Sequence, residues 1–77
     1  MAGEELERLE TKLRELLVET RRAKGMNQTE LAQALGWTQV IVSNYERGER
    51  RVGVSDFILI ARALDEEPTA LLGRLLA

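Results

Sequence analysis

Side chains that form paired hydrogen bonds are concentrated between residues 38 and 44, in the segment TQVIVSN. The amides of Gln39 and Asn44 both donate and accept, so each can make a bidentate pair with the edge of an adenine. The hydroxyl of Ser43 can donate or accept, and the methyl groups of Val40 can contact a thymine methyl. Each of these residues could equally be a solvated position on an exposed helix. The surrounding sequence has to decide between the two interpretations.

The charge distribution around this segment is uneven. The chain carries a net charge of -2 over 77 residues. The stretch from residue 21 to residue 51 holds six basic and three acidic residues, a local charge of +3, which leaves -5 for the remainder. The basic residues of this stretch are Arg21, Arg22, Lys24, Arg47, Arg50 and Arg51. A local basic face favours contact with phosphates even when the whole chain is acidic.

Histidine and cysteine are both absent from the chain. It therefore lacks the commonest general base, a thiol nucleophile, and the nitrogen and sulfur ligands of a structural zinc site. A glycine-rich phosphate loop is also missing. We therefore expect no enzymatic activity, no metal site and no cofactor.

The start of the sequence is acidic and lacks the basic and then apolar pattern of a secretory signal. The longest apolar run, at residues 57–61, is far too short to cross a bilayer. The absence of cysteine fits a reducing compartment. We expect a cytoplasmic protein that does not associate with membranes.

Apolar residues recur at three- and four-residue steps along most of the chain, and no segment alternates as a strand would. This periodicity predicts a compact all-α fold of five helices, at about residues 4–24, 28–35, 39–47, 54–64 and from 68 onward. Asn27 and Thr38 are suitable N-caps, Gly36 a helix stop, and Pro68 a first-turn residue. The expected apolar stripes of the first and fourth helices are Leu6, Leu9, Leu13, Leu16 and Leu17, and Val54, Phe57, Ile58, Ala61 and Leu64.

Three small or branched residues between positions 28 and 47 have spacing that suits two short helices crossing over a tight turn. Ala32 leaves room where the helices approach each other. Gly36 can adopt the positive φ that the turn requires without strain. Val42 can fill the angle between the helices, with Tyr45 in the core behind it. This steric pattern predicts that the polar residues from 38 to 44 lie on an outward face.

The segments GMNQTELAQALGWTQ (25–39), NYERGER (44–50) and ARALDEEPTALL (61–72) resemble the lambda-repressor-like, Cro/cI-type (XRE-type) helix-turn-helix family. The resemblance covers about residues 13–72. It implies a helix-turn-helix domain over 13–77, with residues 1–12 as a helical extension continuous with the first helix. In this family the helix after the turn lies in the major groove of DNA.

The resemblance also implies roles for individual residues. The positions whose side chains touch base edges in the family correspond to Thr38, Gln39, Val40, Ser43 and Asn44. The positions that contact phosphates correspond to Asn27, Gln28, Arg47, Arg50 and Arg51. Gln28 matches the family residue that also braces the recognition glutamine, here Gln39.

Three further features follow from the comparison with the family. Arg21 and Glu46 occupy positions that form a partly buried ion pair in some relatives. Trp37 is bulkier than the usual residue at its position and is expected to pack on the fourth helix or to reach the DNA backbone. The loop RRVGV (50–54) lacks the proline that many relatives carry and resembles the loops of small restriction-modification controller proteins.

A second subunit is expected, because a domain of this size is only marginally stable alone and one recognition helix touches few base pairs. The candidate interface residues are Leu59, Leu72, Leu75 and Leu76. The resemblance implies a homodimeric, sequence-specific regulator of transcription, a repressor, that binds a near-palindromic double-stranded site. The alternative is a protein-interaction module with the same fold, such as an antitoxin that binds a toxin, or an adaptor.

Overall fold

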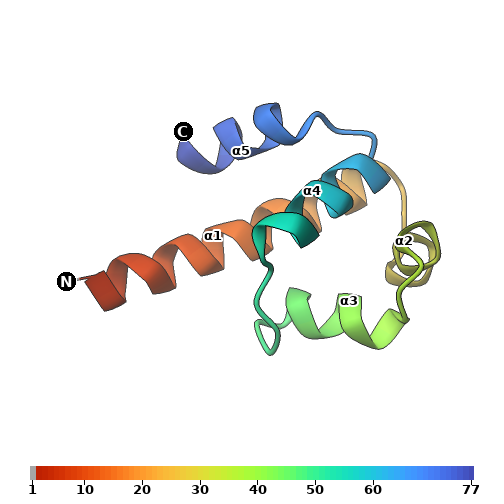
Figure 1. The fold of residues 1–77 in the computed structure, drawn as a ribbon, viewed down its shortest axis with the longest axis horizontal. Coiled ribbons are helices and arrows are strands. Elements are labelled where there is room, and N and C mark those ends of the chain that lie inside the picture. Colours follow the sequence, from red (N-terminus) through yellow and green to blue (C-terminus); the bar gives the residue numbers. More distant parts are fainter. Residues whose placement is uncertain (1) are drawn as a thin grey trace.

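A computed structural model describes residues 2–77 as five helices, without strands in that range. They are α1 (Ala2–Ala23), α2 (Gln28–Leu35), α3 (Gln39–Glu46), α4 (Val54–Ala63) and α5 (Pro68–Leu76). The all-α prediction is confirmed, and each helix lies within about two residues of its expected limits. The N-terminal part of α1 projects beyond the other helices, and α3 lies at the opposite edge of the molecule from α5 (Figure 1).

The two short central helices are delimited by their caps. The side chain of Asn27 accepts a hydrogen bond from the backbone N–H of Glu30. In return, the Glu30 carboxylate accepts a hydrogen bond of 2.9 Å from the backbone N–H of Asn27. This capping box fixes the start of α2. Gly36 ends α2 at φ 71°, a left-handed conformation that costs glycine no strain. Thr38 then caps α3 by accepting from the N–H of Ile41.

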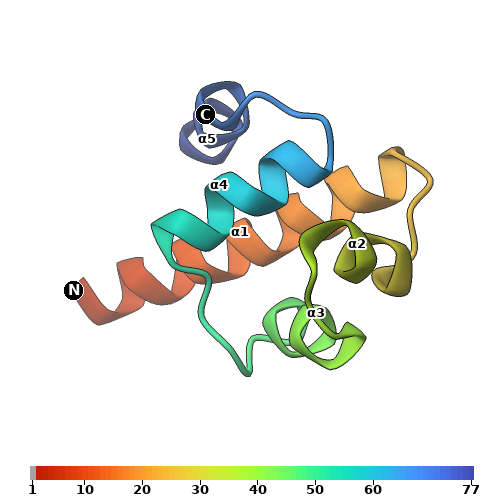
Figure 2. The ribbon, with the colours of Figure 1, turned by 45° about the vertical axis from the view of Figure 1, so that its right-hand side comes forward.

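The core lies where α2 and α3 meet the other helices. Ala32 and Val42 are buried at 2% and 0% exposure, as the steric pattern predicts. Helix α2 contacts α3 and α4, whereas α1 contacts α3 and α5. Figure 2 shows α2 and α3 together on one side of α1, with α5 on the other. The core residues contributed by all five helices are Leu16, Leu17, Leu31, Ala32, Val42, Tyr45, Ile60, Ala61, Leu64 and Leu71.

The predicted stripe of α4 is partly wrong. Val54 was expected to face the core but is 79% exposed, whereas Ile60 is fully buried. Val54 is the first residue of α4, and the buried surface of this helix begins a turn later, at Phe57. The packing of α4 is therefore centred on Phe57, Ile60, Ala61 and Leu64, a continuous helical stripe.

Tyr45 presents the clearest pH-dependent feature of the core. It is 1% exposed, and its hydroxyl lies buried without a protein hydrogen-bond partner. Burial raises the pKa of the Tyr45 phenol above its ordinary value, and the nearby Glu46 carboxylate raises it further.

Because the phenol ionises near pH 10 in the unfolded chain but at higher pH in the folded one, stability is expected to fall as the pH rises above about 10. Tyr45 is the only tyrosine, so tyrosinate absorbance follows this one group. We expect the absorbance to rise together with the loss of helical circular dichroism. Tyr45→Phe should fold with a weaker dependence on alkaline pH. Ionisation of Tyr45 near pH 10 in a fully helical protein would contradict this prediction.

Candidate nucleic-acid interface

Helix α3 presents a polar face to solvent while its opposite face is anchored in the core. Val42 and Tyr45 are buried and hold the helix against the rest of the protein. The side chains of Thr38, Gln39 and Val40 are exposed, and those of Ser43 and Asn44 are half-buried. All five predicted base-contacting residues thus belong to α3 or its N-cap. Val40 is 60% exposed, so its methyl groups are available for an apolar contact.

The first residue of α3 is held by a hydrogen bond from the first residue of α2. Nε2 of Gln39 donates to Oε1 of Gln28 at 2.7 Å. In turn, Nε2 of Gln28 donates to Oε1 of Glu46 at 2.8 Å. Two glutamines that are eleven residues apart are thereby connected to a carboxylate at the far end of α3. This arrangement fixes the Gln39 amide before any ligand binds.

Glu46 also forms a bidentate ion pair with Arg21 of α1. Nε of Arg21 donates to Oε2 at 2.7 Å and Nη2 donates to Oε1 at 3.0 Å, with side-chain exposures of 8% for Arg21 and 6% for Glu46. Nη1 of Arg21 donates to the carbonyl of Met26 at 2.8 Å. The hydrogen bond and charge of Glu46 raise the pKa of Arg21. The predicted ion pair is therefore confirmed.

Arg47 lies at the C-terminal end of α3 and donates to neighbours on the same surface. Its Nη1 donates to Oγ of Ser43 at 2.7 Å, and its Nη2 donates to Oδ1 of Asn44 at 2.8 Å. Nη2 also pairs with Glu49 at 3.1 Å. Arg47 therefore orders the two polar side chains in the second half of α3, which is a role that the sequence did not suggest.

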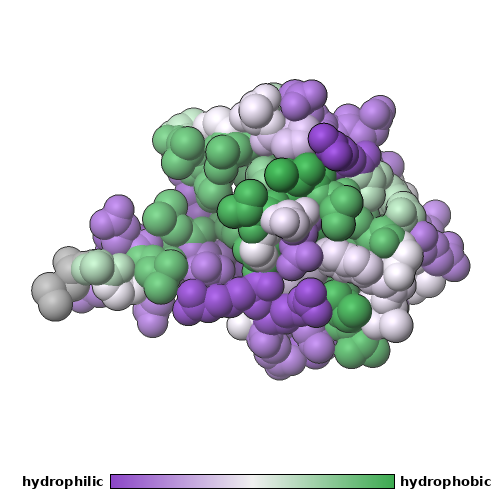
Figure 3. All heavy atoms as spheres, in the orientation of Figure 1, coloured by the Kyte–Doolittle hydropathy of each residue, from purple (hydrophilic) through white to green (hydrophobic). Residues whose placement is uncertain are grey.

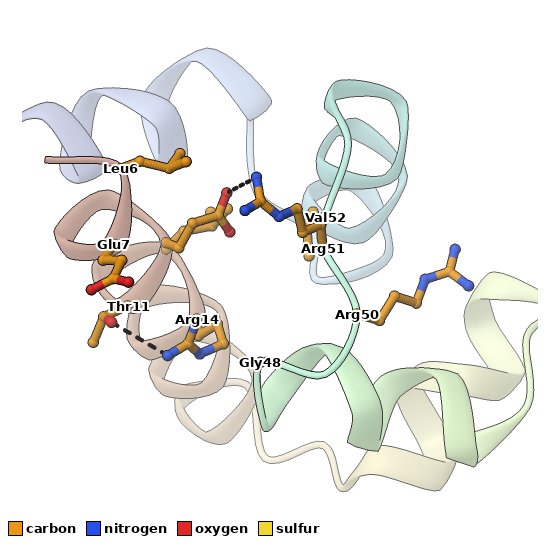
Figure 4. Close-up of a pocket in the computed structure, with 10 residues that line it drawn as sticks. Leu6, Glu7, Thr11, Arg14, Gly48, Arg50, Arg51 and Val52 are labelled. Atoms are coloured by element: carbon orange, nitrogen blue, oxygen red, sulfur yellow. Dashed lines mark hydrogen bonds and ion pairs between the residues drawn. The ribbon is translucent and has the colours of Figure 1, made fainter. Parts of the chain in front are cut away.

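The two loop arginines are each paired with a carboxylate of the same chain. Nη2 of Arg50 lies 3.7 Å from Oδ2 of Asp56, and its guanidinium stacks 5.7 Å from the centre of the Trp37 ring. Nη1 of Arg51 lies 3.9 Å from Oε1 of Glu10. The two side chains line a cleft of about 350 Å³ between the loop and α1. Figure 4 shows the Arg51 guanidinium extended toward α1. The loop is thus tied to α4 and to the N-terminal part of α1.

Trp37 contacts both the hydrophobic core and Arg50 of the loop that follows α3. It is partly buried and packs against the core, in agreement with the expected structural role. Its ring also supports Arg50 by a cation–π contact, which is worth up to about 1 kcal/mol at an exposed site. The bulky residue at this position therefore helps to position a predicted phosphate contact.

The start of α2 supplies the remaining predicted phosphate contacts. The Asn27 side chain is engaged in the capping box, so its oxygen already accepts a hydrogen bond. Gln28 is half-buried and uses one N–H of its amide for Glu46, which leaves the second N–H free. Unpaired backbone N–H groups at a helix N-terminus favour an anion, so this end of α2 suits a phosphate.

Apolar side chains gather on a different surface, formed by α1, α4 and α5 (Figure 3). Of the predicted interface residues, Leu59, Leu72 and Leu76 are 48%, 43% and 71% exposed. Leu75 is partly buried and packs against the core. The exposed leucines of α1 are Leu6 and Leu9, at 42% and 41%. We call these five exposed residues, Leu6, Leu9, Leu59, Leu72 and Leu76, the leucine face.

Residues 2–77 contain neither a metal-binding cluster of side chains nor a helix that could cross a membrane. No group of three or more carboxylate, histidine or cysteine side chains in this range could hold a metal ion. Within the same residues, none of the helices has both the length and the apolar character needed to cross a bilayer.

The chain matches known proteins in both sequence and fold. The helix-turn-helix family model HTH_3 matches residues 17–71. The fold is similar to that of the XRE-family like protein from Pseudomonas syringae pv. tomato str. DC3000, with a TM-score of 0.86 and 38% identity over 97% of this chain and 93% of that one. None of the curated proteins compared with it matches the chain.

Two restriction-modification controller proteins have similar structures. C.AhdI from Aeromonas hydrophila has a TM-score of 0.73 and 39% identity, covering 80% of this chain and 94% of that protein. Wild-type C.Esp1396I has a TM-score of 0.82 and 25% identity, covering 88% of this chain and 87% of that protein. With the family model spanning most of its length, the chain belongs to the XRE-type helix-turn-helix family of DNA-binding transcriptional regulators.

Proposed function

We propose that this protein is a sequence-specific repressor that reads the major groove with α3, as a homodimer on a near-palindromic operator. The observation that carries the proposal is the exposed polar face of α3, with the Gln39 amide braced by Gln28 at 2.7 Å. A braced amide loses little side-chain entropy on binding, so more of its hydrogen-bond energy contributes to base discrimination.

The phosphate contacts are assigned to residues on either side of this face. Arg47, Arg50 and Arg51 follow α3, and Gln28 precedes it at the start of α2. In the free protein the three arginines pair with Glu49, Asp56 and Glu10. These surface pairs are weak, so phosphate groups can replace the carboxylates at small cost. Release of counterions from the DNA then makes the affinity strongly dependent on salt.

The homodimer is assigned to the leucine face. Contiguous exposed apolar side chains are a feature of association surfaces in soluble proteins. The face lies over α1, α4 and α5, away from the polar face of α3 (Figures 1 and 3). Pairing through it leaves both copies of α3 free to enter successive major grooves about 34 Å apart.

The test is selection of binding sites from random duplex DNA with the full chain. We expect a two-fold symmetric consensus, with an affinity that falls steeply with added salt. Gln39→Ala should relax the preference at one base pair in each half-site, by about 1–3 kcal/mol of discrimination. A reporter promoter that overlaps the consensus should lose transcription when the protein is expressed.

Gln33→Ala is the matched control, because Gln33 is an exposed glutamine of α2 that makes none of the contacts described above. It should retain the full consensus. Recovery of random sequences by the wild-type protein at physiological salt, where sequence-independent binding is weak, would rule out sequence-specific reading.

A further inference from the structure

The carboxylate of Glu46 determines which groups donate and which accept in the two hydrogen bonds that connect it through Gln28 to Gln39. An ionised carboxylate accepts hydrogen bonds and donates none. Glu46 accepts from Nε and Nη2 of Arg21 and from Nε2 of Gln28, and its side chain is only 6% exposed. All three partners must therefore present N–H groups to it.

This requirement fixes the orientation of both glutamine amides. The amide nitrogen of Gln28 must face Glu46, so its oxygen faces Gln39. Because that oxygen can only accept, the amide nitrogen of Gln39 must face Gln28, at 2.7 Å. Rotation of either amide by half a turn would set two donors or two acceptors against each other. The buried ion pair thus determines which atoms of Gln39 remain free.

The free atoms of Gln39 are one N–H and the carbonyl oxygen. Adenine presents the matching pair in the major groove, with N7 as acceptor and the N6 amino group as donor. Guanine presents two acceptors, N7 and O6. The carbonyl oxygen of Gln39 would then face O6, and neither oxygen could donate a hydrogen bond to the other. A glutamine amide held in the opposite orientation would present both of its N–H groups and would suit guanine.

We propose that Glu46 is a specificity-determining positioning residue, which makes Gln39 select adenine over guanine by setting the direction of the Glu46–Gln28–Gln39 hydrogen bonds. The inference rests on the proposed function, because it requires Gln39 to contact a base. Glu46 acts entirely through Gln28, since it lies at the other end of α3 and is buried.

The test is Glu46→Gln, which keeps the shape of the side chain but exchanges one acceptor for a donor. The base pair read by Gln39 is first identified as the one at which Gln39→Ala loses its preference. Operators with adenine or guanine at that position are then titrated. We expect wild type to prefer adenine by about tenfold or more, and Glu46→Gln to bring the ratio of the two Kd values close to one.

Ile60→Val is the control for a purely structural effect, because it mildly destabilises a core site on α4 that lies outside this network. It should keep the wild-type ratio of Kd values. Gln28→Met removes the hydrogen bonds between Glu46 and Gln39 but leaves the Arg21–Glu46 pair in place. It should therefore bring the ratio of the two Kd values close to one, even if Glu46→Gln does not fold.

An unchanged adenine preference in folded Glu46→Gln and in Gln28→Met would overturn the inference, as would a wild-type preference for guanine. Failure of the proposed function has a different outcome, because the wild-type protein would then show no preference at any base pair.

Discussion

Glu46→Ala is expected to lower the free energy of unfolding by about 3 kcal/mol, near the lower end of the range for breaking a buried ion pair. The substitution leaves the Arg21 guanidinium with 8% side-chain exposure and no carboxylate, while Nη1 keeps its bond to the Met26 carbonyl. A chain of 77 residues has a total stability of about 4–12 kcal/mol. The loss is therefore a large part of what holds the domain together.

Urea unfolding followed by circular dichroism measures this effect. Glu49→Ala is the matched control, because it removes an exposed partner of Arg47, with side chains that are 58% and 61% exposed. Exposed pairs contribute about 0–1 kcal/mol, so the control should unfold close to wild type. Equal midpoints for the two variants would mean that the Arg21–Glu46 pair does not stabilise the fold.

Local features of this chain could be predicted because they depend on adjacent residues. The capping box of Asn27 and Glu30 requires residues three positions apart, and the turn at Gly36 requires a residue that tolerates positive φ. The N-cap at Asn27 and the helix stop at Gly36 were both predicted from the sequence and are present in the structure. The burial of Ala32 and Val42 follows from the same local geometry, because two short helices joined by a tight turn must approach closely.

Contacts between long side chains that are distant in sequence could not be predicted in the same way. Arg51 and Glu10 are separated in the sequence by more than half of α1 and all of α2 and α3, and their pairing depends on how the loop passes α1. The bond from Gln28 to Glu46 requires a choice of rotamer at both ends. The phase of α4 was also missed, because periodicity does not show at which turn a helix first meets its neighbours. Val54 is exposed for this reason.

The polar face of α3 could be predicted from the sequence more completely than the leucine face. The residues of α3 were assigned through the family resemblance, and their outward direction follows from the buried positions of Val42 and Tyr45. Leu59, Leu72 and Leu76 were expected at an interface and are exposed. Leu6 and Leu9 were predicted as part of the apolar stripe of the first helix, and in the structure they are exposed. A leucine repeat by itself does not distinguish a core from an association surface.

Leu72→Glu is expected to convert the protein to a folded monomer and to weaken binding to the full operator by about a hundredfold or more. Leu72 is 43% exposed on the leucine face, so a carboxylate there would be desolvated by a partner subunit but hydrated in the monomer. Loss of the dimer removes the high effective concentration that connects the two half-sites. Such a connection commonly contributes a factor of about 10²–10⁴ in affinity.

Sedimentation equilibrium and operator titration together separate assembly from base reading. Ala70→Glu is the matched control, because Ala70 is exposed on α5 but lies about 200° around the helix from Leu72. It should remain dimeric with wild-type affinity. Leu72→Glu should melt as a folded domain and bind an isolated half-site as the wild-type monomer does. If Leu72→Glu stayed dimeric, the interface would have to lie elsewhere. If the wild-type protein were monomeric on its operator, the two half-sites would have to be read independently.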